Sequence, residues 1–387
     1  MSSFFFLLII LLVSLPPLLS VKAAVPIPPT PPQISALDKG LKDLQAASSQ
    51  PNNNKSLQIS DGIKKPPTPK PKIHDFNFNV TNNQSSYSPA PASAPPPRIK
   101  GLHLVKEYLY TYGYIQNSSS SSGNFTDLMD ENTVSSITDY QRFFNLDTTG
   151  DIDNATYQQI LLPRCGVPDM NVTYELPANF SWLQGTLLFA NSTKILSYGF
   201  DPRYNLQSEI TNVFKDSFQR WSEAIGILNF TQTTFNDANI KIVFVDLSDN
   251  NETIGDEFGA ALYNGSGSGS GIMVMDSSKT WVLPNVTRLS WEEGEVDLES
   301  VVMHQIGHLL GLSHSTDDDD SVMFPSVVDS QQRKVELSED DKVQIQQLYF
   351  PGKPSDEHTN SQDGVESGRG FIMACLFLGF ASMVLFF

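Results

Sequence analysis

Apolar side chains recur at helical spacing from residue 102 to residue 161. Leucine, valine and tyrosine stand close to three or four positions apart in residues 102–112, and residues 134–144 repeat the pattern with other apolar side chains. Positions at this spacing share one face of an α-helix. After a turn at residues 147–150, Asp153 is a candidate cap for a third helix that reaches Leu161. Residues 99–162 are therefore predicted to form a small all-helical domain.

The pattern changes further along the chain, where short apolar strands alternate with amphipathic helices. Strands are predicted at residues 195–198, 240–247 and 272–275, and helices at residues 210–225, 298–310 and 338–349. The last helix carries Glu339, Asp340 and Asp341 in its first turn, where the helix dipole favours negative charge. Strands mixed with three helices are typical of an α+β fold. We predict one such domain over residues 191–352.

The stretch before the helical domain has a different composition. Residues 25–98 are rich in proline, serine and asparagine and contain few large apolar side chains. Such a stretch buries too little apolar surface to offset the entropy that it loses on ordering. We predict a disordered pro-segment over these residues.

Both ends of the chain carry apolar runs that are typical of processing signals. Residues 4–15 and the following Ala23-Ala24 predict a secretory signal peptide over residues 1–24, with an uncleaved anchor as the alternative. Residues 371–387 are apolar to the last residue and follow a polar spacer at 353–370, which predicts a GPI-attachment signal or, alternatively, a retained membrane tail. Asn360, Asp363 and Ser367 are the candidate attachment residues. Thirteen N-x-S/T sequons agree with passage through the secretory pathway.

Charge and the scarcity of two residue types narrow the classes of function. The 387 residues include 43 acidic and 25 basic side chains, for a formal net charge of -18. Nucleic-acid binding depends on positive charge, so we expect no nucleic-acid partner. Six histidines and two cysteines, Cys165 and Cys375, allow very few metal sites and no disulfide framework. If the tail is removed, the mature chain keeps only the Cys165 thiol.

The candidate chemistry lies on the helix predicted at residues 298–310. His304 and His308 are four positions apart, so both rings project from one face and can bind one ion. Gly311 can adopt the left-handed conformation that ends a helix and turns the chain back, which brings His314 in as a third ligand. Three neutral imidazoles leave one position of a tetrahedral zinc site open, as in catalytic sites. We predict one zinc held by these three histidines.

These residues, with Met323 in Ser-Val-Met-Phe-Pro, resemble the metzincin arrangement, and the chain resembles the matrixins, in particular plant matrix metalloproteinases. The resemblance covers residues 100–350 and includes the motif Pro163-Arg-Cys-Gly-Val-Pro-Asp169. It implies a twisted, mostly parallel sheet with three helices. It also implies that the helical domain before the sheet is a peptidoglycan-binding-like propeptide domain, for which a generic three-helix bundle is the alternative.

The resemblance also assigns roles to individual residues. It implies that Cys165 ligates the zinc in a latent zymogen and that Arg164 and Asp169 hold the cysteine-switch loop at residues 163–169. A stray free thiol is the alternative for Cys165. Met323 is expected beneath the metal as the Met-turn, and activation would cut the linker at residues 170–190.

Gln305 departs from the family pattern, which has glutamate directly after the first histidine. The motif in this chain is a degenerate HQxxHxxGxxH. At this position a carboxylate takes the proton of the attacking water and delivers it to the leaving nitrogen. A neutral amide cannot take that proton. We therefore predict weak or absent peptidase activity. The alternative explanation for Gln305 is an allele or a sequencing error.

A second departure concerns the other metals of the family. Between Cys165 and His304 the chain has no histidine, which excludes a structural zinc ligated by histidine. Asp276 is a candidate calcium ligand, but Lys279 stands where a carboxylate is expected. We predict one zinc per chain and keep Asp276 as a candidate calcium ligand.

The functional prediction is a secreted or surface-anchored zinc metalloendopeptidase that is made as a latent zymogen and acts on extracellular proteins or peptides. An extended substrate would add to an exposed edge strand near residues 258–263. The alternatives are an inactive pseudoprotease that binds zinc and peptides or inhibitors, and an adhesive surface protein that uses its helical domain on polysaccharide. We expect a monomer, attached to the membrane through its C-terminal tail, at the outer face of the plasma membrane or in the extracellular matrix or cell wall.

Overall fold

The computed structural model describes residues 35–47, 55–59, 96–115, 125–170, 194–248, 254–264, 270–284, 295–327 and 333–350. The predicted signal peptide, polar spacer and apolar C-terminal run lie outside the described residues, as does the predicted activation linker apart from Met170. Within the part of the chain that is described, no helix is long and apolar enough to cross a membrane.

Three helices form the predicted helical domain. They are α3 (Leu102–Thr111), α4 (Glu131–Phe143) and α5 (Asn154–Ile160). The carboxylates of Asp130 and Asp153 each accept a hydrogen bond from the backbone N–H three residues further on, and so cap α4 and α5. Leu102, Ile137 and Tyr140, none of them exposed, lie in the core that the helices share. The prediction of a small all-helical domain is confirmed.

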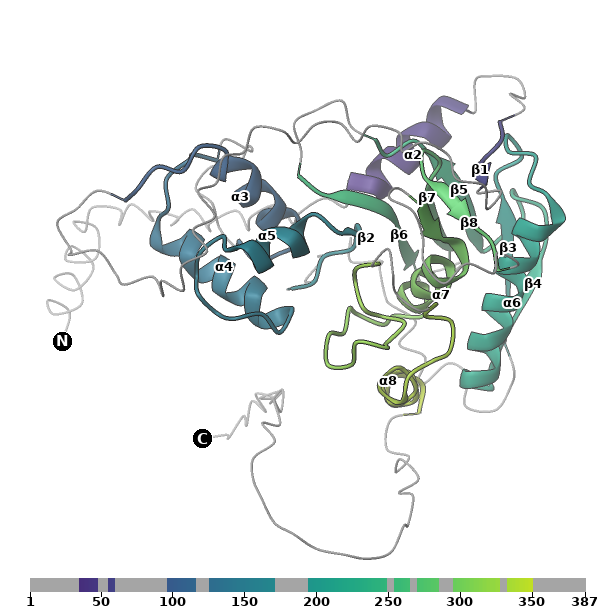
Figure 1. Cartoon of the computed structure of the whole chain (residues 1–387). Helices are drawn as coiled ribbons and strands as arrows, with labels where there is room; N and C mark the ends of the chain where they lie inside the picture. The colour runs from purple at the N-terminus through teal and green to yellow at the C-terminus, as the bar shows by residue number, and fades with distance from the viewer. Residues whose placement is uncertain are drawn as a thin grey trace, which may run out of the picture. The chain divides into compact units, whose positions relative to one another are not determined.

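A six-stranded sheet is the centre of the second domain (Figure 1). In spatial order its strands are β2 (Pro163–Cys165), β6 (Asp256–Asn264), β7 (Ser270–Asp276), β5 (Ile240–Val245), β3 (Lys194–Phe200) and β4 (Leu228–Gln232). Neighbouring strands run parallel except β6 and β7, which are antiparallel. The predicted mixed fold with a mostly parallel sheet is confirmed. The edge strand β2 comes from the cysteine motif and not from the domain that it joins.

Three helices and a smaller sheet complete this domain in the described residues. The helices are α6 (Ser208–Ile225), α7 (Leu298–Leu309) and α8 (Glu339–Tyr349), and the small sheet has the order β1 (Gln58–Ile59), β8 (Thr280–Val282), β9 (Glu295–Asp297). The buried Trp221 indole of α6 donates a hydrogen bond to the carbonyl oxygen of Met303 in α7 at 2.9 Å. The Tyr349 hydroxyl of α8 donates to the carbonyl oxygen of Leu310 at 3.1 Å. These two contacts fix α7, the helix that carries the histidines, against both other helices.

The prediction of disorder over residues 25–98 is wrong for two segments. Residues Ser35–Ala47 form helix α2, and Gln58–Ile59 form strand β1. Helix α2 packs on β5, β6 and β7 through Ala36 and Leu37, whose exposed fractions are 0% and 6% (Figure 1). The segment itself has little apolar surface, so the sheet supplies the surface that makes ordering favourable.

Candidate metal centre

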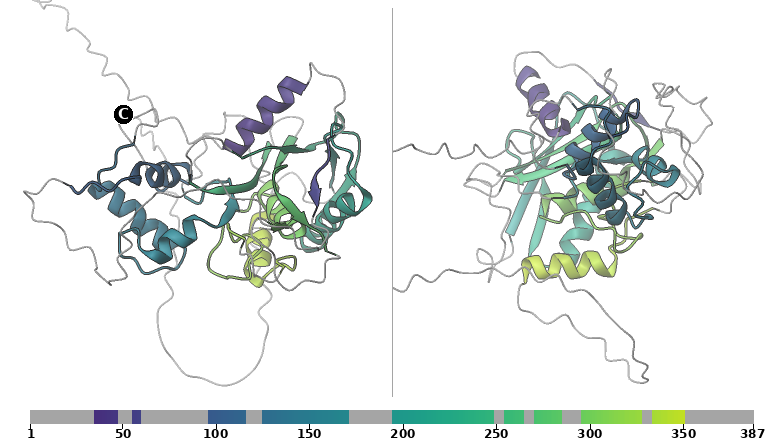
Figure 2. Two further views of the ribbon diagram at one scale, coloured as in Figure 1. Left: turned by 45° about the horizontal axis from the view of Figure 1, so that its top comes forward. Right: turned by 90° about the vertical axis from the view of Figure 1, so that its left-hand side faces the viewer.

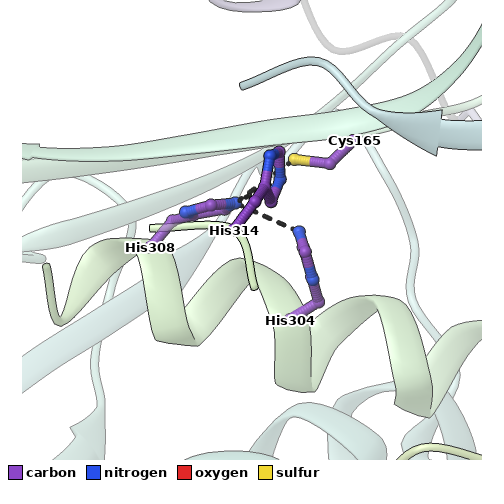
Figure 3. A group of neighbouring side chains, drawn as sticks. All are labelled: Cys165, His304, His308 and His314. Carbon is purple, nitrogen blue, oxygen red and sulfur yellow. Dashed lines mark hydrogen bonds between the residues drawn. The ribbon is translucent and has the colours of Figure 1, made fainter. Parts of the chain in front are cut away.

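Helix α7 and the turn after it bring three histidines together. His304 and His308 lie one turn apart on α7, which starts with its N-cap, Asp297, accepting a hydrogen bond from the Ser300 amide at 2.8 Å. Gly311 follows the helix with φ of 97°, a left-handed conformation that a residue with a side chain rarely adopts. The reversal places His314 beside the other two rings, as Figure 3 shows.

The four ligand atoms of this cluster converge on one point. The Nε2 atom of His308 lies 3.1 Å from the Nε2 atoms of both His304 and His314, and 3.4 Å from the sulfur of Cys165 (Figure 3). All four ligand atoms lie within 4.8 Å of one another. Zinc–nitrogen bonds of about 2.0–2.1 Å at tetrahedral angles place two nitrogens about 3.3 Å apart. The cluster therefore has the dimensions of a tetrahedral zinc site.

Hydrogen bonds on the far side of each ring decide which nitrogen faces the centre. The Nδ1 atoms of His304 and His308 lie 2.8 and 2.9 Å from the carbonyl oxygens of Val322 and Leu312, so both donate a proton there. The Nδ1 atom of His314 lies 2.7 Å from a carboxylate oxygen of Asp169. Each Nε2 atom is therefore unprotonated and points its lone pair toward the other two Nε2 atoms. A cation at the centre would bind all three lone pairs.

Burial keeps the three rings in the form that binds metal. It lowers the pKa of His304 and His308 far below the usual histidine range, and the neighbouring histidines lower it further. Burial also lowers the pKa of His314, although Asp169 acts in the opposite direction. Burial raises the pKa of the Cys165 thiol to about 12, so a cation is needed to hold its sulfur as thiolate.

The strand that carries Cys165 lies between two segments of the second domain. On one side β2 pairs with β6. On the other side the Cys165 amide donates to the carbonyl oxygen of Pro325 at 2.8 Å, and the Val327 amide donates to the carbonyl oxygen of Pro163 at 2.9 Å. The chain's own β2 strand therefore pairs with the outer edge of β6 at residues 256–259, which overlaps the start of the edge predicted for an extended substrate at residues 258–263.

Asp169 links the cysteine loop to the metal centre. One of its oxygens accepts hydrogen bonds from the Arg164 guanidinium at 2.6 Å and from His314 at 2.7 Å, and the other accepts one from the Tyr114 hydroxyl at 2.7 Å. Burial alone would raise the pKa of Asp169, but Arg164 and His314 hold it below its usual range. The same carboxylate thus orients a ligand and fixes the loop that carries the sulfur.

Tyrosines of the helical domain complete the surroundings of Arg164, and the sequence analysis did not identify them. The guanidinium carbon lies 3.5 Å from the centre of the Tyr112 ring, and a guanidinium nitrogen donates to the Tyr108 hydroxyl at 3.0 Å. The sequence indicates them, because tyrosines lie on the inward face of the predicted first helix. A buried tyrosine hydroxyl usually has a hydrogen-bond partner, so several in a small core predict polar neighbours.

Gln305 lies inside the centre with half of its amide unpaired. It is fully buried, and its Nε2 donates to the sulfur of Cys165 at 3.4 Å. Its Oε1 has no hydrogen-bond partner. Glu299, a carboxylate earlier on the same helix, forms ion pairs with Arg220 and Arg333 at 3.7 and 3.6 Å instead. The Gln305 position therefore carries an amide in contact with the sulfur, and Glu299 is engaged elsewhere.

Beside the cysteine loop lies the carboxylate of Glu257, which was not predicted from the sequence as a site residue. Glu257 of β6 accepts a hydrogen bond from the Tyr112 hydroxyl at 3.1 Å, and its carboxylate lies against Gly166. Burial raises its pKa. Its partner Tyr112 belongs to the helical domain, so Glu257 is held on the side of the loop that faces that domain.

Met323 lies directly beneath the helix that carries the ligands. A Cβ atom added at Gly307 would lie 2.2 Å from the Met323 sulfur and 3.3 Å from the Trp221 ring. Met323 is fully buried, so its side chain has little room to move away. The glycine between the two helical histidines is thus required by the methionine of the turn.

Gly307→Ala is expected to lower the free energy of unfolding by about 1–3 kcal/mol, because overpacking a filled core forces neighbours out of place. Denaturant unfolding of the metal-free chain measures it. Adding Met323→Val should recover part of the loss, since the shorter side chain vacates the contested space. Equal stability of Gly307→Ala and the native chain would show that the contact is easily relieved.

Asp276 has protein partners on both carboxylate oxygens. It accepts hydrogen bonds from the Leu247 amide at 3.0 Å and the Ser278 amide at 2.8 Å. The Lys279 ammonium lies 3.6 Å from Asp276 and forms a closer ion pair with Asp256. Calcium at Asp276 stays a prediction; in this structure the cation beside Asp276 is the Lys279 ammonium.

Lys279→Met is expected to destabilise the chain by about 2–3 kcal/mol, because it leaves Asp276 buried without its counter-ion. The loss should fall below the roughly 3–5 kcal/mol of a fully buried pair, since the partner Asp256 is 37% exposed. The matched control is Lys342→Met, which removes an exposed ion pair with Glu339 and should cost less than about 0.5 kcal/mol. Equal shifts in denaturant midpoint would argue against an internal cation at Lys279.

Two helical histidines, a third after a left-handed glycine and a buried methionine beneath them define a zinc metallopeptidase fold. The family model for matrixins matches residues 190–350, and that for a peptidoglycan binding domain matches residues 100–160. Metalloendoproteinase 5-MMP of Arabidopsis thaliana is 34% identical over 308 residues, which cover 72% of this chain and 84% of the relative. Metalloendoproteinase 1 of Glycine max is 34% identical over 256 residues, 65% of this chain and 82% of the relative. The chain belongs to the matrixin family, in its plant type, and zinc is the cofactor that this family implies.

Proposed function

We propose that the chain is made as a latent matrixin whose peptidase activity is impaired at Gln305. The contact between the Gln305 amide and the Cys165 sulfur supports both parts, because the sulfur occupies the open side of the three histidines and an amide stands where the base is needed. Zinc bound here supplies a Lewis acid that polarises the scissile carbonyl and acidifies water. Gln305 can donate a hydrogen bond to that water or accept one from it, but cannot take its proton.

Latency follows from what the β2 strand covers. It pairs with β6 and with the segment after Met323, and it carries the sulfur to the histidines. An extended extracellular protein or peptide would need the same strand edge. Cutting the linker at residues 170–190 and displacing β2 would open the site.

The experiment separates latency from impairment with four zinc-loaded full-length chains: native, Cys165→Ala, Gln305→Glu and the double variant. Cleavage of a quenched peptide is measured before the linker is cut and after the helical domain is removed. Before the cut, only the double variant is expected to cleave, and slowly, because β2 still lies on β6; after removal, Gln305→Glu should reach the rate of the double variant. Equal rates for these two chains before the cut would refute latency through Cys165.

A pseudoprotease is the second candidate, and the same Gln305 amide favours it. Such a protein would bind peptides or inhibitors at the zinc-bearing centre without turnover. The test uses the Cys165→Ala chain, which keeps Gln305. A peptide that binds this chain and is recovered intact would distinguish a pseudoprotease from a slow enzyme.

Location and assembly complete the proposal. The apolar N-terminal run and the sequons support secretion, and the apolar C-terminal run supports a lipid anchor or membrane tail at the cell surface. The protein would act as a monomer without nucleic acid. Release of the protein from intact cells by a phosphatidylinositol-specific phospholipase would support the lipid anchor, and retention would favour the tail.

A further inference from the structure

Helix α2 and residues 55–59 both contact the second domain, and α2 lies on the face of the six-stranded sheet opposite the metal centre. Phe244 of β5 packs against Phe214 of α6, with ring centres 6.3 Å apart. Its neighbour Val243 points to the other face, because side chains alternate along a strand. Val243 and Val274 lie under α2, so the sheet separates α2 from α7, as the two views of Figure 2 show.

The fit between α2 and the sheet is close. A Cβ atom added at Gly40 would lie 2.5 Å from a methyl carbon of Val274 and 3.6 Å from one of Val243. Ala36 is fully buried in the same core cluster as the sheet strands. Small residues on this face of α2 let its backbone approach the sheet, as in an internal helix of a domain.

Polar contacts hold the same segment at three further points. The Arg203 guanidinium pairs with Asp43 at 2.5 Å and with Asp201. The Lys55 amide donates to the carbonyl oxygen of Arg203 at 2.9 Å, and its own carbonyl accepts from the Asn205 amide at 3.2 Å. Strand β1 then pairs with β8, with Gln58 opposite Thr280 and Ile59 opposite Trp281.

These contacts differ from those that hold the helical domain except at Ala36, which lies beside Gly166 of the cysteine loop. The latter run through Arg164, Asp169 and the two sides of β2, at the metal centre. Helix α2 instead covers Val243 and Val274, which are fully buried in the described structure. Loss of the segment would therefore expose apolar sheet surface and the edge of β8, whereas loss of the helical domain opens the metal centre.

We infer that residues 35–59 are an integral, non-covalently held part of the catalytic-type domain. They stay bound after the linker at residues 170–190 is cut, while the helical domain between them and that linker is the part that is displaced. The inference rests on the proposed maturation by cleavage. Its consequence is that one cut leaves the helical domain tethered next to the site at high effective concentration, and that full release needs a second cut between residues 60 and 95.

The test uses the full chain with recognition sites for a specific protease inserted in residues 61–94 and 172–192, Cys165→Ser, and an affinity tag after residue 351. After both cuts and zinc chelation, the tagged piece is captured and washed. The piece with residues 35–59 is expected to elute with it at equal stoichiometry. Its loss in the wash would overturn the inference, whether or not the helical domain is retained.

A matched pair of variants shows whether the packing of α2 is responsible. Gly40→Leu, at the contact with Val274, should weaken binding of a synthetic 33–60 peptide to the stripped domain about tenfold or more. Lys42→Leu, at an exposed position of the same helix, should leave it within about twofold. Equal affinities would contradict the docked α2. The cuts are engineered and the readout is co-elution, so the outcome does not depend on peptidase activity. A Gln305→Glu chain that cleaves no faster than the native chain would refute the proposed function and leave this result unchanged.

Discussion

Gln305→Glu is expected to raise peptide cleavage about 10²- to 10⁴-fold, the usual contribution of a positioned general base. The structure places the Gln305 side chain beside the cluster, fully buried and in contact with the Cys165 sulfur. A carboxylate at the same position could take the proton of the attacking water, which the amide cannot. The rate constant for a quenched peptide, measured in the Cys165→Ala background with zinc loaded, gives the effect without interference from latency.

Two controls make this result specific. Adding His308→Ala to the Gln305→Glu variant should return the rate to background, because it removes a ligand whose Nε2 lies 3.1 Å from both other histidine nitrogens. Gln305→Leu should be no faster than the native chain. A native chain within tenfold of Gln305→Glu would refute impairment and would direct attention to another base, with Glu257 beside the cysteine loop as the first to substitute.

His308→Ala is expected to abolish tight zinc binding. His308 is the ligand nearest to all three others, and its loss removes one of four converging donors. Loss of an outer partner of a ligand costs about 10- to 100-fold in affinity, so loss of the ligand itself should cost more. The native chain should retain one zinc after dialysis against a weak chelator, and the variant none.

The control for this experiment is His103→Ala. His103 lies in the helical domain, where its ring contacts Asp127 at 2.7 Å, and should not affect zinc content. Two tightly held zinc ions in the native chain would contradict the prediction of a single site, which follows from the absence of histidine between Cys165 and His304. Full zinc content in His308→Ala would show that the three remaining ligands suffice.

The amide at position 305 has opposite consequences in the two forms of the proposed enzyme. Beside a cysteine thiolate, an N–H donor is favourable, whereas a carboxylate would place like charges in contact. Beside a substrate, the same N–H contributes no base. The amide of Gln305 thus stabilises the latent form and weakens catalysis in the open form. It also leaves its Oε1 atom buried without a hydrogen-bond partner.

Much of the centre follows from local sequence because its determinants are short. Two histidines four residues apart lie on the same face of any helix. Gly311 adopts the left-handed conformation that ends this helix and reverses the chain. The helices α6, α7 and α8 and the strands β3, β5 and β7 likewise follow from apolar periodicity over short windows. These features need no knowledge of contacts between distant residues.

The sequence by itself determined the mixed fold, the three histidines and the amide at Gln305, and it predicts a single zinc because it has no histidine between Cys165 and His304. Only the tertiary structure decided that Asp169 serves both Arg164 and His314, that Tyr112 supports the cysteine loop, and that Lys279 is the cation beside Asp276. It also decided that residues 35–47 are helical. The physical reason is that these features depend on partners far away in the chain, and a segment with little apolar surface of its own becomes ordered when another element supplies that surface.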